Sequence, residues 1–143
     1  MYRQDDYPVF IEKLESRFPK MFVAQYGGVD VGAGWWHIVE RLCANIQYCI
    51  DNRNRTRQVL LAGNPYNVPV PDEIPQVVVT QIKEKFGGLR FYYNGGNDKI
   101  DGLVCMAETW AYNTCETCGQ PGELRIDGWL KTLCDTHAAE RVK

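Results

Sequence analysis

Four residues near the C-terminus have the types and the spacing of a metal site. Cys115 and Cys118 stand three apart in TCETCGQPG, and Cys134 and His137 stand three apart in LCDTH, with 15 residues between the two pairs. Paired ligands at this spacing are typical of zinc sites. Three thiolates and one imidazole suit a tetrahedral Zn²⁺, and thiolate-rich sets select zinc over calcium or magnesium. The sequence therefore predicts one bound Zn²⁺.

The residues between the two pairs fit the same interpretation. ELRIDGWLKT reads as two four-residue strands around Asp127-Gly128, which is a strong hairpin signal. We call the segment TCETCGQPG, residues 114–122, the knuckle. The order of knuckle, hairpin and a short helix that begins with the second ligand pair predicts a treble-clef-like zinc finger. Four protein ligands leave no open position for water, so we expect a structural site. Its metal would stabilise a tail that is too short to build its own core.

The chemistry of the finger argues against two other roles. From residue 115 to residue 143, four Lys and Arg face five Asp and Glu, and Zn²⁺ with three thiolates adds one further negative charge. Phosphate neutralisation dominates DNA affinity, so the finger alone is a poor nucleic-acid binder. Zinc deaminases need H-x-E and P-C-x-x-C, whereas His37 precedes Ile-Val-Glu and Thr114 precedes Cys115. We expect no catalytic set and no enzyme activity.

The elements that must position this site predict an α+β fold, with helices packed on a β-hairpin or small antiparallel sheet. Helical spacing of apolar residues predicts helices at residues 8–18, from residue 35 to the arginines that follow residue 52, and at residues 99–113. The last helix should turn Leu103, Ala107, Trp110 and Ala111 inward, with Cys105 near the core. VVVTQIKEKFGGLRFYY predicts a hairpin that turns at Gly87-Gly88. We expect a body at residues 1–113 and a zinc-finger module at residues 114–143 packed on it.

Two segments connect these elements. QYGGVDVGAG, residues 25–34, has four glycines and predicts a loop. Residues 62–76 contain four of the seven prolines, so they can be neither a regular helix nor an inner strand. We expect an extended connector there.

Basic residues in the body offer a second functional surface. Lys83, Lys85 and Arg90 lie among aromatic residues that include Tyr92, and such a mixture can stack on and neutralise a nucleotide or a single strand. The alternative is a half-buried hairpin with aromatic cross-strand pairs and lysines on its wet face. A second basic group, Arg53, Arg55 and Arg57, favours either a helix C-terminus or contacts with phosphate.

Composition limits the remaining possibilities. The chain has 143 residues, a formal net charge of −2 and 45% hydrophobic residues, so it is globular and lacks an overall basic field. It contains no apolar run long enough for a membrane span, and its first ten residues do not resemble a signal peptide. We therefore expect a cytoplasmic protein, in which six cysteines serve metal binding or burial rather than disulfides.

The segments QIKEKFGGLRFYY, TCETCGQPG and WLKTLCDTHA, with a GWW helix start near residue 35, resemble small uncharacterised phage and prophage proteins. This resemblance covers roughly the C-terminal half and implies the cytoplasm of a bacterial host. We expect a non-enzymatic binding protein that engages a host or phage protein, for example to inhibit a bacterial defence system in an anti-CRISPR-like role. Two alternatives stay open: a nucleic-acid-binding zinc-finger protein, and a nucleotide-sequestering protein that uses the hairpin and the loop at residues 25–34.

Overall fold

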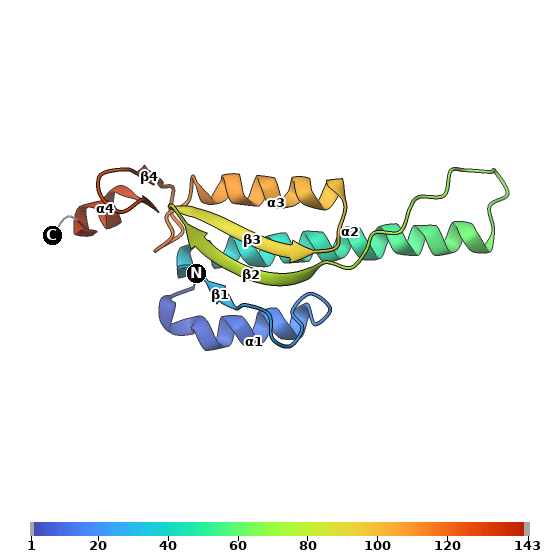
Figure 1. Ribbon diagram of the computed structural model, residues 1–143, viewed down its shortest axis with the longest axis horizontal. Coiled ribbons are helices and arrows are strands. Elements are labelled where there is room, and N and C mark those ends of the chain that lie inside the picture. Colours follow the sequence, from blue (N-terminus) through green and yellow to red (C-terminus); the bar gives the residue numbers. More distant parts are fainter. Residues whose placement is uncertain (1, 142–143) are drawn as a thin grey trace.

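The computed structural model describes residues 2–141 and has an α+β architecture (Figure 1). Its helices are α1 (Tyr7–Arg17), α2 (Trp36–Ala62), α3 (Asp98–Ala111) and α4 (Asp135–Arg141), with short 3-10 turns η1 (Gln4–Asp6) and η2 (Ala33–Trp35). One sheet has the order β1-β2-β3, formed by β1 (Val29–Asp30), β2 (Val78–Lys85) and β3 (Gly88–Asn94). A second sheet pairs β4 (Glu123–Arg125) with β5 (Lys131–Leu133). The predicted α+β class is confirmed, but the larger sheet is mixed rather than antiparallel, because β1 runs parallel to β2.

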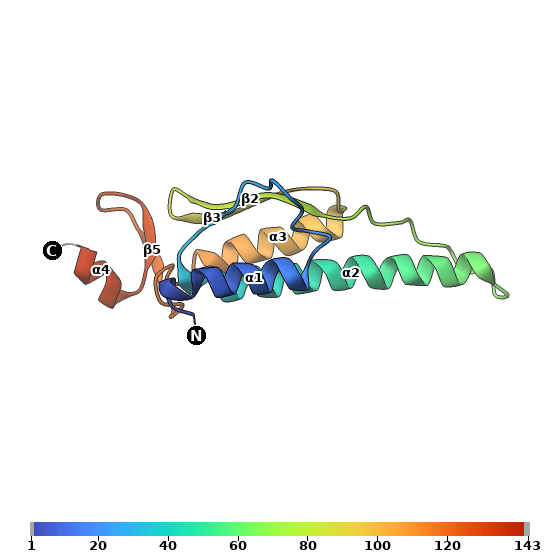
Figure 2. The ribbon, with the colours of Figure 1, turned by 90° about the horizontal axis from the view of Figure 1, so that it is seen from below.

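The three long helices lie on one side of the larger sheet. Figure 2 shows the sheet edge-on, with α1, α2 and α3 on the same side of it. Strand β2 is central, because β1 pairs with it in parallel and β3 pairs with it in antiparallel fashion. The core is aromatic where α1 packs against the start of α2: Phe10 of α1 stacks on Trp36, with 4.7 Å between the ring centroids. Both Trp35 and Trp36 are fully buried, and each indole N–H donates to a backbone carbonyl.

Helix α2 is longer than the sequence predicts, so the three arginines do not mark its C-terminus. It continues past the arginines to Ala62, so that its outer end projects beyond the body as an arm (Figure 1). The reason is tertiary: Asn54 exchanges two hydrogen bonds with the backbone of Ile74, and the Arg57 guanidinium donates to the carbonyl of Pro71 at 3.0 Å. These bonds hold the extended connector against the helix. The arginines therefore lie inside α2, and the helix-terminus explanation for them is wrong.

Two turns and one helix face also differ from expectation. The β2–β3 turn consists of Phe86 and Gly87, which both have positive φ, rather than of Gly87-Gly88. The β4–β5 hairpin exists, but its strands are three residues long and a five-residue loop, residues 126–130, joins them. Helix α3 buries a stripe rotated from the expected one, which comprises Ile100, Val104, Ala107 and Ala111. Cys105 is consequently exposed and is not part of the core.

Candidate metal centre and adjoining surfaces

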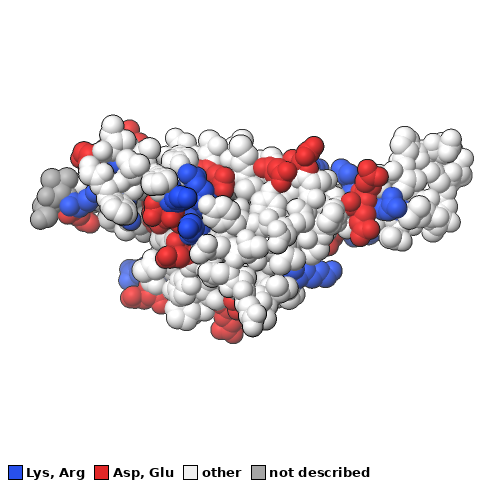
Figure 3. All heavy atoms as spheres, viewed as in Figure 1, with Lys and Arg blue, Asp and Glu red and all other residues white. Residues whose placement is uncertain are grey.

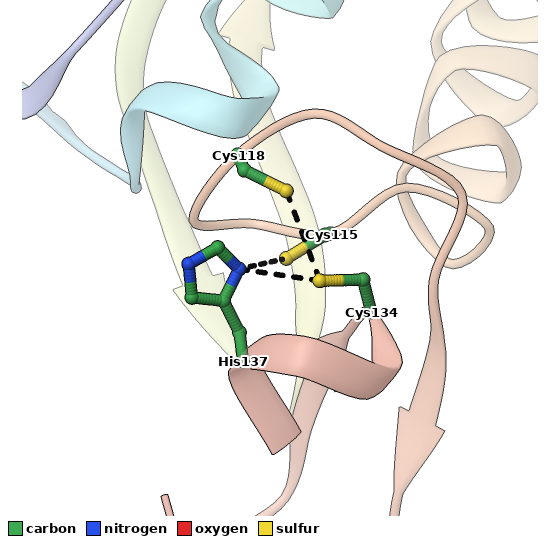
Figure 4. A group of neighbouring side chains, drawn as sticks. All are labelled: Cys115, Cys118, Cys134 and His137. Carbon is green, nitrogen blue, oxygen red and sulfur yellow. Dashed lines mark hydrogen bonds between the residues drawn. The ribbon is translucent and has the colours of Figure 1, made fainter. Parts of the chain in front are cut away.

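The four predicted ligands come together at one end of the molecule. Cys115 and Cys118 lie in the knuckle that follows α3, Cys134 follows β5 directly, and His137 lies in the first turns of α4. Their three sulfur atoms and one ring nitrogen all lie within 4.8 Å of one another, and Figure 4 shows them converging on a common point. This group can hold one metal ion.

The distances within this group fit tetrahedral coordination. A tetrahedral ion with metal–sulfur bonds of about 2.3 Å and metal–nitrogen bonds of about 2.0 Å separates two sulfurs by roughly 3.8 Å and a sulfur from a nitrogen by roughly 3.5 Å. The sulfurs of Cys118 and Cys134 are 3.8 Å apart, and the Nδ1 atom of His137 lies 3.6 Å from Cys115 Sγ and 3.2 Å from Cys134 Sγ. The contacts that the dashed lines mark in Figure 4 are thus close in length to the edges of such a tetrahedron.

The surroundings of the site favour the thiolate form of one ligand. Burial raises the pKa of Cys115, but backbone N–H groups, first that of Cys134, outweigh burial and lower the pKa to about 7. Burial raises the pKa of Cys118 to about 11, and the neighbouring thiols contribute to this increase. A bound cation would reverse the second shift, because a metal deprotonates its thiol ligands. The opposite ring nitrogen of His137, Nε2, lies 3.9 Å from the carboxylate of Glu140.

The knuckle rests directly on the body through the segment that precedes α2. Gly34 N–H donates to the carbonyl of Glu116 at 2.8 Å, and the indole N–H of Trp35 donates to the carbonyl of Thr114 at 2.8 Å. Gly34 has to be glycine, because a Cβ there would lie 2.6 Å from the amide nitrogen of Gly119 and closer still to the carbonyl oxygen of Cys115. Two of the four glycines of the predicted loop, Gly32 and Gly34, therefore lie against the knuckle.

The β4–β5 hairpin contacts the β2–β3 turn. The hydroxyl of Thr132, which is fully buried, donates to the carbonyl of Gly87 at 2.6 Å, and Glu116 N–H donates to the carbonyl of Thr132 at 3.0 Å. A Cβ at Gly87 would lie 3.2 Å from the amide nitrogen of Lys131, so the two hairpins are in close contact. Metal site, knuckle and hairpin turn thus form one connected unit.

The residues proposed for the basic hairpin surface lie on the outer face of the sheet. Lys83 pairs directly with Arg90 across β2 and β3, Tyr92 pairs with Gln81, and Lys85 is exposed near the turn. Figure 3 shows blue side chains grouped at the end of the sheet beside the metal module, bordered by red ones, on a face that is otherwise mostly uncharged. The structure thus brings Lys83, Lys85 and Arg90 together.

The three arginines of α2 are not part of that group. Arg53, Arg55 and Arg57 lie in the arm, at the opposite end of the molecule from the β2–β3 turn (Figure 1). Arg57 also holds the connector through its bond to Pro71. The two basic groups are therefore separate surfaces and cannot form one continuous phosphate-binding face.

Two exposed aromatic side chains lie beside the lysines: Phe86, one of the aromatic residues that the sequence places among them, and Trp129, which no sequence pattern indicated. Phe86 and Trp129 are 64% and 77% exposed, and both line one cavity of about 440 Å³ with Lys83, Lys85 and Leu130. Phe86 adopts φ +54°, a conformation that bulky residues rarely take. Its position beside Gly87 in a hairpin turn was the available signal, but Trp129 lies 43 positions further along the chain. Only the fold brings the two rings to one cavity.

Comparisons of the chain with protein-family models, with curated proteins and with solved structures each found no match. Within residues 2–141, none of the helices combines the length and the apolar character that a membrane span requires.

Proposed function

We propose that this chain is a non-enzymatic binding protein that a structural zinc ion stabilises. Three sulfurs and an imidazole at tetrahedral spacing support zinc as the metal, and four protein ligands leave no position for a reacting water. The order of knuckle, β-hairpin and helix supports a treble-clef-like finger at residues 114–143, with residues 1–113 as the body. On this proposal the metal shapes a binding surface and takes no part in chemistry.

The observation that carries the proposal is the aromatic surface at the metal end, which Phe86 and Trp129 form around their shared cavity. Trp129 is 77% exposed and lines one cavity with the exposed Phe86 and with Leu130, and contiguous exposed apolar patches mark interaction sites. Trp is also enriched among the residues that dominate binding energy in protein interfaces. The two hairpins that carry these rings are held together by the Thr132–Gly87 bond, so the surface is preorganised.

The partner that fits this surface is a protein. The resemblance of three segments to phage and prophage proteins favours a host or phage protein, encountered in the cytoplasm of a bacterium. Inhibition of a bacterial defence component is the role we propose within that setting, because a small binding protein can act by occupying a surface of its target. The resemblance alone supports the phage origin.

Affinity capture from bacterial lysate tests this function. Wild type, Trp129→Ser and the matched surface variant Tyr48→Ser, which changes an exposed aromatic residue in the middle of α2, serve as baits in parallel. A protein that wild type and Tyr48→Ser retain, and that Trp129→Ser loses, is the expected result. Recovery of nucleic acid alone, or equal capture by all three baits, would rule out a protein partner at this surface.

A second candidate function rests on the lysines of the same cavity. Lys83 and Lys85 stand beside the two exposed rings, and this combination suits a single strand or a nucleotide. Nucleic-acid binding at this cavity should weaken steeply as salt increases, with Lys83→Ala and Lys85→Ala flattening the slope. A mononucleotide should instead raise the melting temperature in a thermal-shift screen. No effect of either ligand at low salt would remove both alternatives.

A further inference from the structure

A second cavity lies beside the knuckle, where five segments of the chain meet. It has a volume of about 870 Å³ and is lined by the N-terminal segment, the turn after β1, strand β2, the knuckle and the start of β5. Figure 1 shows the N-terminus close to the knuckle end of the sheet, which agrees with this arrangement. Binding sites commonly form at such junctions.

One wall of this cavity contains a buried carboxylate that is only half satisfied. Glu116 is 7% exposed, and its Oε2 accepts a hydrogen bond of 2.9 Å from Gly32 N–H. Its Oε1 is buried and has no hydrogen-bond partner among the described residues. The ammonium group of Lys131 lies 3.9 Å from Oε1, beyond hydrogen-bond distance. Buried carboxylate oxygens rarely lack a donor in native proteins, so this atom points to a missing partner.

The other charges of the cavity indicate the sign of that partner. Asp30 and Glu84 line the same space as Glu116, whereas only Arg3 and Lys131 oppose them. Three carboxylates against two cations leave an excess of one negative charge. The Lys131 side chain is 41% exposed and can turn towards water at little cost, which would open Oε1 to a ligand. The cavity is therefore suited to a cationic hydrogen-bond donor.

Geometry distinguishes a guanidinium from a metal ion as that donor. Within residues 2–141 the only group of three or more metal-ligating side chains close enough to hold one ion is Cys115, Cys118, Cys134 and His137, so the three carboxylates of this cavity are not gathered around a common point. A guanidinium has five N–H donors in a rigid fork and can bond two separated carboxylates at once. Arginine is also one of the residues most enriched in interface hot spots.

We propose that this cavity binds the side chain of an arginine that a protein partner presents, with Glu116 Oε1 as its principal acceptor. This inference rests on the proposed function, since it assumes a protein partner. It adds a charged anchor next to the aromatic surface and predicts that the partner's contact region contains an arginine. Glu84 or Asp30 supplies the second carboxylate.

The test titrates N-acetyl-argininamide into the full zinc-loaded chain and follows the backbone amide signals of Gly32 and Glu116 by NMR. The neutral isostere N-acetyl-citrullinamide is the matched probe. Glu116→Gln removes the negative charge but keeps a side-chain oxygen that can accept from Gly32 N–H. Glu84→Gln likewise removes a charge and keeps an oxygen that can accept from Gly87 N–H. Glu12→Gln, on the exposed face of α1, is the matched control variant.

The arginine probe should shift both amide signals, and the citrulline probe should not. Glu116→Gln should weaken arginine binding by about tenfold or more, because a hydrogen bond between charged groups is lost, while Glu12→Gln should bind as wild type does. No shift with arginine, equal shifts with citrulline, or wild-type affinity in Glu116→Gln would overturn the inference.

The two proposals fail separately. If the arginine probe does not bind but Trp129-dependent capture of a protein persists, the arginine inference is wrong and the proposed function stands. If the probe binds but no protein depends on Trp129, the cavity serves a free guanidinium ligand, and both the partner assignment and the proposed function are wrong.

Discussion

Gly34, which contacts the knuckle backbone, provides the sharpest test of how the metal centre depends on the body. In Gly34→Ala the new Cβ would lie 2.6 Å from Gly119 N and 2.7 Å from the carbonyl carbon of Glu116. Both atoms belong to the backbone, so the knuckle has to move as a unit, by roughly 1 Å, to restore ordinary van der Waals distances. No side-chain rotation can relieve this clash.

That movement would break or stretch three hydrogen bonds that cross the contact. They are Gly34 N–H to the Glu116 carbonyl, Gly32 N–H to the Glu116 carboxylate, and the Trp35 indole to the Thr114 carbonyl. At about 1 kcal/mol each, their loss costs about 3 kcal/mol. If this cost falls on the metal-bound state, zinc affinity decreases by about two powers of ten.

Denaturant unfolding of the zinc-loaded chain and competition with a zinc chelator measure the two effects. Gly102→Ala is the control, because nothing lies within 4 Å of a Cβ at that position in α3. It should stabilise the chain by about 0.5–1 kcal/mol through helix propensity. If Gly34→Ala unfolds and releases zinc as wild type does, the knuckle is not seated on this segment and the reasoning fails.

Three further predictions concern the metal, a histidine and the strained turn. Elemental analysis should find about one zinc per chain in wild type and none in Cys118→Ser, and a strong chelator should unfold the C-terminal module; unchanged folding would contradict the site. Burial lowers the pKa of His37 below its usual 6.5, so the unfolded chain takes up the proton first as pH falls. The unfolding free energy should therefore be constant above pH 6.5 and decrease below it, and the decrease should be larger in wild type than in His37→Gln. Parallel pH profiles of the two proteins would exclude a contribution from His37. Phe86→Gly should raise the unfolding free energy by about 1 kcal/mol by relieving the positive φ, yet weaken partner capture, whereas a loss of stability would show that the ring supports the fold.

The close approach of the four Cys and His side chains could be predicted because each pair is local in the sequence. Cys115 and Cys118, like Cys134 and His137, are three positions apart, and chemistry restricts which residue types can bind zinc at that spacing. Helical periodicity was equally effective for α1 and for the first half of α2, where Val39, Leu42 and Ile46 are buried as their spacing indicates.

The errors arose where distant segments decide local structure. The polar run after Ile50 looked like the end of a helix, but hydrogen bonds from Asn54 and Arg57 to the connector keep it helical. Gly87-Gly88 looked like the hairpin turn, but a Cβ at Gly88 would lie 2.5 Å from the ring of Tyr112, so that glycine is required beside α3. Helix α3 rotates towards β3, where Glu108 accepts from Phe91 N–H, and this leaves Cys105 outside.

The bond between Trp35 and Thr114 joins positions that are 79 residues apart, and this separation affects biosynthesis. The ribosome makes the N-terminal segments first. A nascent chain that ends before the knuckle contains the Trp35 indole and the Gly34 N–H, but it lacks the carbonyls of Thr114 and Glu116 that accept from them. Metal supply therefore acts at the last step of maturation. If the site holds zinc as proposed, a finished chain without metal would remain open at this end and would be more accessible to proteases.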